Sequence, residues 1–182
     1  MDKLGRTLLI LARNAIAARF GEPPVATPDL PELHGFGATF VTLTQQGHLR
    51  GCIGTLEAWR PLLQDVQENA CNAAFRDPRF TPLIAAEVPV TRVEVSLLTA
   101  PEAFDFSDEA DALARLRPQV DGVIFNAGHH RATFLPQVWE QLPEPAAFMG
   151  HLKQKAGLLA GYWGPDVRLQ RYAVKKWKEN DA

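Results

Sequence analysis

The stretch GATFVTLTQQGHLRGCIGT, residues 37–55, has the pattern of a β-hairpin. Apolar and polar residues alternate over its first half, as they do in a strand that buries one face. Residues 45–47 form a turn, and the chain returns as a second strand from His48 to Thr55. The sequence therefore predicts an antiparallel strand pair that carries the hexad LRGCIG, residues 49–54, on its second strand.

Helices and further strands are expected on both sides of this hairpin. Helical patterns cover residues 3–19, 61–75 and 145–157, with short helices near 82–87 and after Pro136 and a helix that Ser107 caps and that ends near 117. Strand patterns cover residues 90–98, 123–126, 131–135 and about 167–174. Because the strands and helices do not alternate regularly, the pattern predicts an α+β fold in one domain over residues 1–182, with antiparallel sheets and flanking helices.

The composition excludes several classes of protein. Of the 182 residues, 46% are hydrophobic and 22% charged, as in an ordinary globular domain. The net charge is −2, so nucleic acid is not an expected partner. No apolar stretch has the length of a membrane span, and the N-terminal apolar run is too short for a signal peptide. Two cysteines do not make a disulfide scaffold, and their scarcity favours a reducing, cytoplasmic environment.

The hexad places an arginine and a thiol two positions apart. In a regular strand Arg50 and Cys52 point to the same face, where the guanidinium would favour the thiolate form of the cysteine. Cys52 is therefore a candidate nucleophile, although free cysteine is often only a small, half-buried apolar residue. Glycines at positions 51 and 54 are expected to leave the main chain open to a ligand. We interpret the hexad as the floor of a cleft.

Other polar residues are candidates for the same site. Glu94, on the polar face of its strand, is the preferred partner for Arg50. The histidines that could act as a base are His34, His48, His129 and His130, and none of them is convincing. The turn that contains Asp77 and Arg79 either binds an anion or is a structural corner held by Asp77, and the second alternative is favoured. No metal-ligand spacing and no cofactor motif is present. The candidate binding residues are Arg50, Gly51, Cys52, Gly54, Glu94, Asp77 and Arg79, and Cys52 is the candidate catalytic residue.

Several phrases together resemble the AMMECR domain family, whose bacterial and archaeal members are called AmmeMemoRadiSam system protein A. They are LRGCIGTL (49–56), DPRF (77–80), VEVSLL (93–98), FLPQVWEQL (134–142) and KAGL (155–158). The resemblance implies two unequal subdomains, the larger containing both chain ends, around a cleft that the hexad lines. It also implies a Memo-type protein and a radical SAM enzyme as partners. The family has no established activity, so the resemblance indicates a place and not a reaction.

Two functions remain open from the sequence. One is a binding or partner module that acts with the Memo-type and radical SAM proteins on a protein or nucleic-acid-derived substrate, with Arg50 as anion anchor. The other is an enzyme that uses Cys52 as a thiolate nucleophile for acyl or alkyl transfer. Whether the chain is an enzyme, and its oligomeric state, are not specified by the sequence.

Overall fold

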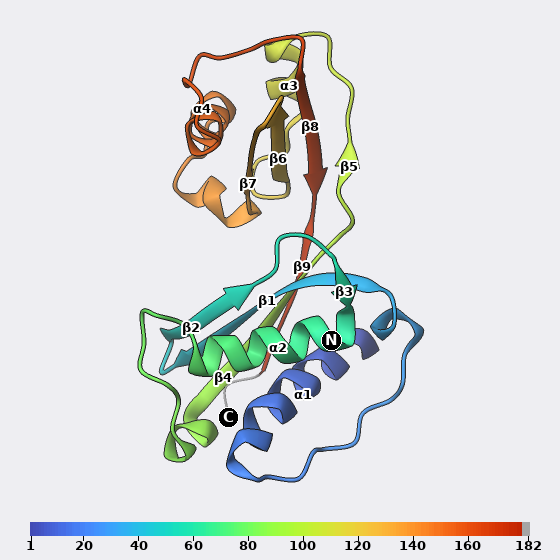
Figure 1. Cartoon of the computed structure of the whole chain (residues 1–182), viewed down its shortest axis with the longest axis vertical. Coiled ribbons are helices and arrows are strands. Elements are labelled where there is room, and N and C mark those ends of the chain that lie inside the picture. Colours follow the sequence, from blue (N-terminus) through green and yellow to red (C-terminus); the bar gives the residue numbers. More distant parts are fainter. Residues whose placement is uncertain (180–182) are drawn as a thin grey trace. The chain divides into compact units, whose positions relative to one another are not determined.

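The structure is a computed structural model that describes residues 1–179, and the chain divides into two compact units (Figure 1). The first unit contains Met1–Leu98 together with the segment that begins at Lys175. The second contains Thr99–Val174. No helix in the described part of the chain is both long and apolar enough to cross a membrane.

The first unit is built on a five-stranded sheet. Its strands are β1 (Phe36–Gln45), β2 (His48–Gly54), β3 (Arg60–Pro61), β4 (Thr91–Leu98) and β9 (Val174–Lys178). Their order is β2-β1-β4-β9, and β3 also pairs with β1. Because β1 is antiparallel to β2, β3 and β4, the predicted hairpin is present and the predicted α+β class with antiparallel sheets is confirmed.

Two helices cover one face of this sheet. Helices α1 (Lys3–Ala17) and α2 (Leu62–Phe75) lie side by side on it in Figure 1. Their apolar side chains pack with those of Val41, Leu43 and Val93 in one core. Strand side chains alternate, so the residues between these valines and leucines face away from the helices. That second face carries Thr42, which lies opposite Cys52 on β2 and opposite Glu94 on β4.

A buried polar network holds α2 against β1. Asp65 of α2 is fully buried and accepts hydrogen bonds from the Thr39 main-chain N–H at 2.8 Å and hydroxyl at 2.7 Å. It also accepts from the Thr55 hydroxyl at 2.7 Å and from Arg60 Nε at 2.9 Å. A buried carboxylate is costly unless it is paired and hydrogen-bonded, and these contacts with Thr39, Thr55 and Arg60 join the helix to the strand region.

The second unit has its own sheet and core. Its strands are β5 (Glu102–Ala103), β6 (Gly122–Ala127), β7 (His130–Phe134) and β8 (Val167–Tyr172), in the order β5-β8-β6-β7, all antiparallel. Its helices are α3 (Glu109–Arg115) and α4 (Pro145–Lys155), with a short 3-10 helix at Pro136–Glu140. In the core, Trp139 stacks on Phe148 with ring centroids 3.7 Å apart, and the Trp139 indole donates to the Asp121 carbonyl.

The structure corrects three local predictions. The expected last strand is two strands, because β8 belongs to the second sheet and β9 to the first. Helix α3 is capped by the Asp108 side chain, while the Ser107 N–H donates to the Asp111 carboxylate. The helix expected near residues 82–87 is a 3-10 helix at Ala85–Val90. The two-residue strands β3 and β5 are too short to produce a periodic pattern.

We expect Asp65→Ala to lower the free energy of unfolding of the first unit by roughly 3–5 kcal/mol, because it leaves the Arg60 guanidinium buried without its main partner. Urea unfolding followed by circular dichroism measures this loss. Glu68→Ala is the matched control: Glu68 also pairs with Arg60, but its side chain is 46% exposed. Its removal is expected to cost about 1 kcal/mol or less. Equal losses in the two variants would contradict the role given to Asp65.

Candidate functional site

The hexad lies on β2, the edge strand of the first sheet, and contains a β-bulge at Arg50. Leu43 pairs with Gly51 and Thr44 with Leu49, so Arg50 is the extra residue between the two pairs. A simple count back from the turn would have paired Thr42 with Gly51, whereas the bulge moves the partner of Thr42 to Cys52. The strict alternation that placed Arg50 and Cys52 on one face therefore does not apply across this point.

Arg50 forms an ion pair with Glu87, in the 3-10 helix Ala85–Val90, and not with Glu94. Its Nε lies 2.9 Å from Oε1 and its Nη2 lies 3.1 Å from Oε2, while the arginine side chain is only 12% exposed. The prediction that Arg50 pairs with Glu94 is therefore wrong. Glu94 lies two strands from Cys52, with Thr42 between them. The Nη1 atom of Arg50 is buried and has no hydrogen-bond partner among the described residues.

Glu87 is held in its charged form by several donors. The Arg50 side chain is the largest cause that lowers its pKa, from 4.5 to about 2, and the Ile84 main-chain N–H adds to the effect. The Gln45 amide also donates to it at 3.2 Å. No sequence signal indicated Glu87, because it lies in a short irregular helix without a periodic pattern.

Asp77 and Arg79 hold the main chain of Cys52 at the open edge of the sheet. The Cys52 N–H donates to Asp77 Oδ2 at 2.9 Å, and Arg79 Nη2 donates to the Cys52 carbonyl at 3.0 Å. An edge strand otherwise leaves such groups without a partner. The two side chains also bond one another, with Arg79 Nη2 2.6 Å from Asp77 Oδ2. This geometry fits the structural corner that the sequence favoured for Asp77.

Asp77 and Arg79 are charged groups that lie close to Cys52. The hydrogen bonds from the Arg79 side chain are the largest cause that holds the pKa of the buried Asp77 carboxyl well below its usual range. The pKa of Arg79 is raised, mainly by its hydrogen bond to Asp77 and also by interaction with the Cys52 side chain. The Arg79 side chain remains 54% exposed. It is therefore an accessible cation within electrostatic range of Cys52.

The Cys52 thiol is half-buried and accepts a hydrogen bond from the Thr42 hydroxyl, at 3.3 Å from oxygen to sulfur. Within residues 1–179 no histidine forms a hydrogen bond with this sulfur. His34 pairs with Asp29, and His130 and His151 bond to main-chain carbonyls. In the same part of the chain, no group of three or more His, Cys, Asp or Glu residues is arranged to hold a metal ion.

The two glycines of the hexad serve packing and do not leave the main chain bare. A Cβ at Gly51 would lie 2.2 Å from the Ala73 carbonyl oxygen of α2, so this glycine lets the strand approach the helix closely. A Cβ at Gly54 would lie 2.2 Å from the ring of Phe40, which covers this position. The prediction that these two glycines leave the main chain open to a ligand is therefore wrong. Their membership of a binding site stays a prediction.

We expect Gly51→Ala to destabilise the first unit by about 1–3 kcal/mol, because the added methyl group forces α2 away from β2. Thermal or urea unfolding measures the change. Gly35→Ala is the control, since the nearest atom to its added Cβ lies at 3.8 Å and this substitution should be nearly neutral. A neutral Gly51→Ala would show that strand and helix can separate there without cost.

The ion pair between Arg50 and Glu87 should make stability depend on pH. A carboxyl with a lowered pKa in the folded chain stabilises the fold above its unfolded pKa and loses this contribution as the pH falls. The advantage of the wild type over Glu87→Gln should therefore be full above about pH 5 and shrink as the pH falls through 4.5 towards about 2. Denaturant titrations between pH 7 and pH 3 measure it.

The control for this pH dependence is Arg50→Met. In that background the pH-dependent effect of Glu87→Gln on stability should be smaller, because the largest cause of the lowered pKa is gone. An effect of Glu87→Gln that stays the same at every pH in the wild-type background would contradict the assignment.

Comparison with known proteins places the chain in a family. Residues 9–177 match the AMMECR1 family. A protein of Methanothermobacter thermautotrophicus is 38% identical over 181 residues, covering 97% of this chain and 94% of its own length. Protein SSO0193 of Saccharolobus solfataricus is 35% identical, covering 98% of this chain and 82% of its own length.

A solved structure agrees with both the sequence match and the fold. The crystal structure of the uncharacterized protein PH0010 from Pyrococcus horikoshii aligns with a TM-score of 0.78 at 32% identity, covering 98% of this chain and 93% of PH0010. The match by sequence spans nearly the whole chain, including the hexad and the residues that hold it. The chain therefore belongs to the AMMECR1 family.

Proposed function

We propose that the chain is a binding module whose ligand lies on the sheet face that carries Cys52. The observation that carries this proposal is the fixation of Cys52 by Asp77 and Arg79, which bond its N–H and its carbonyl. A binding site is effective when its main chain is rigid before the ligand arrives. The side chain of Cys52 then lies on the sheet face opposite the helices, beside Thr42.

The accessible cation of this site is Arg79. Arg50 was the expected anion anchor, but its guanidinium is engaged by Glu87 and its side chain is largely buried. Arg79 is half exposed and keeps part of its guanidinium towards solvent while it holds Asp77. We therefore assign the contact with an anionic group of the ligand to Arg79, and a positioning role to Arg50.

The partners in this proposal come from the family resemblance. They are a Memo-type protein and a radical SAM enzyme, with which the chain would act on a protein or nucleic-acid-derived substrate in the cytoplasm. A module that presents a ligand to two enzymes needs a fixed surface and no catalytic base of its own. This agrees with a sulfur that accepts a hydrogen bond from a hydroxyl and has none from a histidine among the described residues.

A second candidate function is catalysis by Cys52, through a thiolate that accepts an acyl or alkyl group. The observation in its favour is the position of Arg79, a cation whose guanidinium donates to the Cys52 carbonyl at 3.0 Å and so lies next to the residue that carries the thiol. Against it, nucleophilic catalysis usually needs a positioned base that takes the thiol proton. We therefore rank binding above catalysis.

The test compares Arg79→Gln with Arg117→Gln in binding to the purified Memo-type and radical SAM proteins, measured by biolayer interferometry. Arg117 is a matched control because its side chain is 56% exposed and also bonds a buried carboxylate, that of Asp121. We expect Arg79→Gln to weaken binding by at least about fivefold, because it removes a charged contact at the interface. Arg117→Gln should leave binding unchanged.

Further variants separate the two candidate functions. Arg79→Lys should restore part of the binding, since it keeps the charge, and Cys52→Ser should leave binding intact. Unchanged binding in Arg79→Gln, with folding preserved, would contradict the proposed role of this face. If Cys52→Ser instead abolishes turnover of an acyl or alkyl donor while partner binding is unaffected, the catalytic alternative is the correct one.

A further inference from the structure

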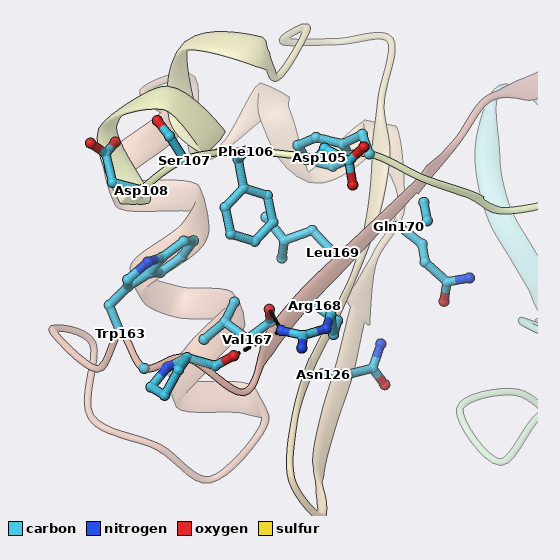
Figure 2. A pocket seen from close by; sticks show the side chains of 14 residues that line it. Asp105, Phe106, Ser107, Asp108, Asn126, Trp163, Val167, Arg168, Leu169 and Gln170 are labelled. Atoms are coloured by element: carbon cyan, nitrogen blue, oxygen red, sulfur yellow. Dashed lines mark hydrogen bonds between the residues drawn. The ribbon is translucent and has the colours of Figure 1, made fainter.

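The second unit contains a groove, and none of its lining residues belongs to the Cys52 site. Its volume is about 890 Å³, and all the residues that line it lie between Ala103 and Gln170 (Figure 2). It is formed by the segment that joins β5 to α3, by β8, and by the turn before β8. We propose that this groove binds a basic peptide segment and takes a lysine side chain, free or methylated, against its aromatic wall.

Three aromatic rings form this wall and are tilted against one another. The ring centroids of Phe106 and Trp163 are 5.3 Å apart with an angle of 59° between the planes. Phe104 and Phe106 are 6.0 Å apart with an angle of 63°. Figure 2 shows Phe106 over Leu169, with Trp163 at its side. A flat base can stack on only one ring of such a set, whereas a compact cation can contact the faces of two.

Two of these rings already accept cations of the chain itself. Arg171 places its guanidinium carbon 5.4 Å from the Phe104 centroid, and Lys153 places its ammonium nitrogen 5.6 Å from the Trp163 ring. Both distances are in the range of favourable cation–π interactions. The aromatic side chains of this unit therefore stand where positive charge is stabilised, and we assign the incoming ammonium group to Phe106, between them.

The charges around the groove favour a cation over an anion. Among the lining residues, the exposed carboxylates of Asp105 and Asp108 outnumber the one guanidinium, that of Arg168. Arg171 and Lys153 are not part of this lining but reach the Phe104 and Trp163 rings. The Arg168 guanidinium is tied to the wall, since its Nη1 donates to the Pro165 carbonyl at 2.9 Å and to the Val167 carbonyl at 2.8 Å (Figure 2). Asp108 uses one carboxylate oxygen to cap α3, and Lys153 is already paired with Glu109. The carboxylate of Asp105 and the second oxygen of Asp108 are therefore the exposed groups of this lining that can meet an incoming cation.

The other end of the groove suits a peptide main chain. Asn126 and Gln170 line it there, and their amide groups can both donate and accept hydrogen bonds. The volume is in the upper part of the range of about 300–1,000 Å³ that is usual for ligand sites. It exceeds that of one side chain, so we expect a few neighbouring residues of the peptide to be held as well.

The experiment uses the full chain and three synthetic peptides of glycine and serine with lysine, trimethyllysine or norleucine at the centre. Binding is followed through the indole N–H signal of Trp163 in NMR spectra, assigned by its absence in Trp163→Phe. We expect both cationic peptides to shift this signal. The norleucine peptide, which has the same aliphatic chain without the charge, should bind at least about fivefold more weakly.

Charge variants test the carboxylates without breaking the fold. The double variant Asp105→Asn, Asp108→Asn should weaken binding of the lysine peptide by about three- to tenfold. Asparagine at position 108 still caps α3 well, so the helix is preserved. Asp2→Asn is the control for the Asp108 change, because Asp2 caps α1 in the first unit and its replacement also removes one negative charge at a helix cap. It should have no effect. Phe106→Leu should weaken binding of the trimethyllysine peptide by about two- to fivefold.

Several results would overturn the proposal. They are equal binding of the norleucine and lysine peptides, tighter binding of a glutamate peptide or of a mononucleotide, and an unmoved Trp163 signal at millimolar concentrations of both cationic peptides. Arg79→Gln should leave the lysine peptide unaffected, so this site and the Cys52 site can fail independently.

Discussion

The candidate site depends on the hydrogen bonds that Asp77 and Arg79 make to the main chain of Cys52. Cys52 lies on an edge strand, where the outward N–H and carbonyl have no neighbouring strand. The buried carboxylate and the half-exposed guanidinium take the place of that strand, and each satisfies the other. Once the main chain is held in this way, the direction of the sulfur is determined as well, because strand side chains alternate.

The second unit uses the same arrangement for a different purpose. Asp121 is fully buried, and Arg117 donates to it from its main-chain N–H at 2.8 Å and from its guanidinium at 2.7 Å. The Asp121 carbonyl in turn accepts from the Trp139 indole in the core. In both units an arginine balances a buried carboxylate while part of its own side chain stays in solvent, which lowers the cost of burying the charge. Of these two carboxylates, Asp77 is the one that is connected to a candidate functional residue.

The two proposed sites differ in the charge of their exposed side chains. Arg79 is the accessible cation beside Cys52, whereas Asp105 and Asp108 border the aromatic groove of the second unit. Together the two proposals describe a protein that binds more than one partner through surfaces of different chemistry. Two modest contacts on one chain can give a much higher overall affinity when both are engaged.

Local patterns in the sequence determined most of the elements around the site. The alternation of apolar residues and the turn at Gln46-Gly47 specified the hairpin, and helical spacing specified α2, because these signals depend on neighbours along the chain. The resemblance through the hexad and the DPRF segment also depended on sequence alone. Asp77 was assigned to a structural corner from its place before a proline, which is a local property too.

The tertiary structure alone decided how the site residues are used. The pairing of Arg50 with Glu87 and the filling of the space at Gly51 by the Ala73 carbonyl depend on residues distant in the sequence. The bulge at Arg50 is local to the hairpin, but it breaks the alternation from which its position would have to be predicted. Alternation cannot indicate such contacts, since it specifies which face a side chain takes and not what it meets there. The sequence therefore determined where the strand with the candidate site residues lies, and the packing of α2 and the Ala85–Val90 helix against it decided which of its charged side chains remain exposed.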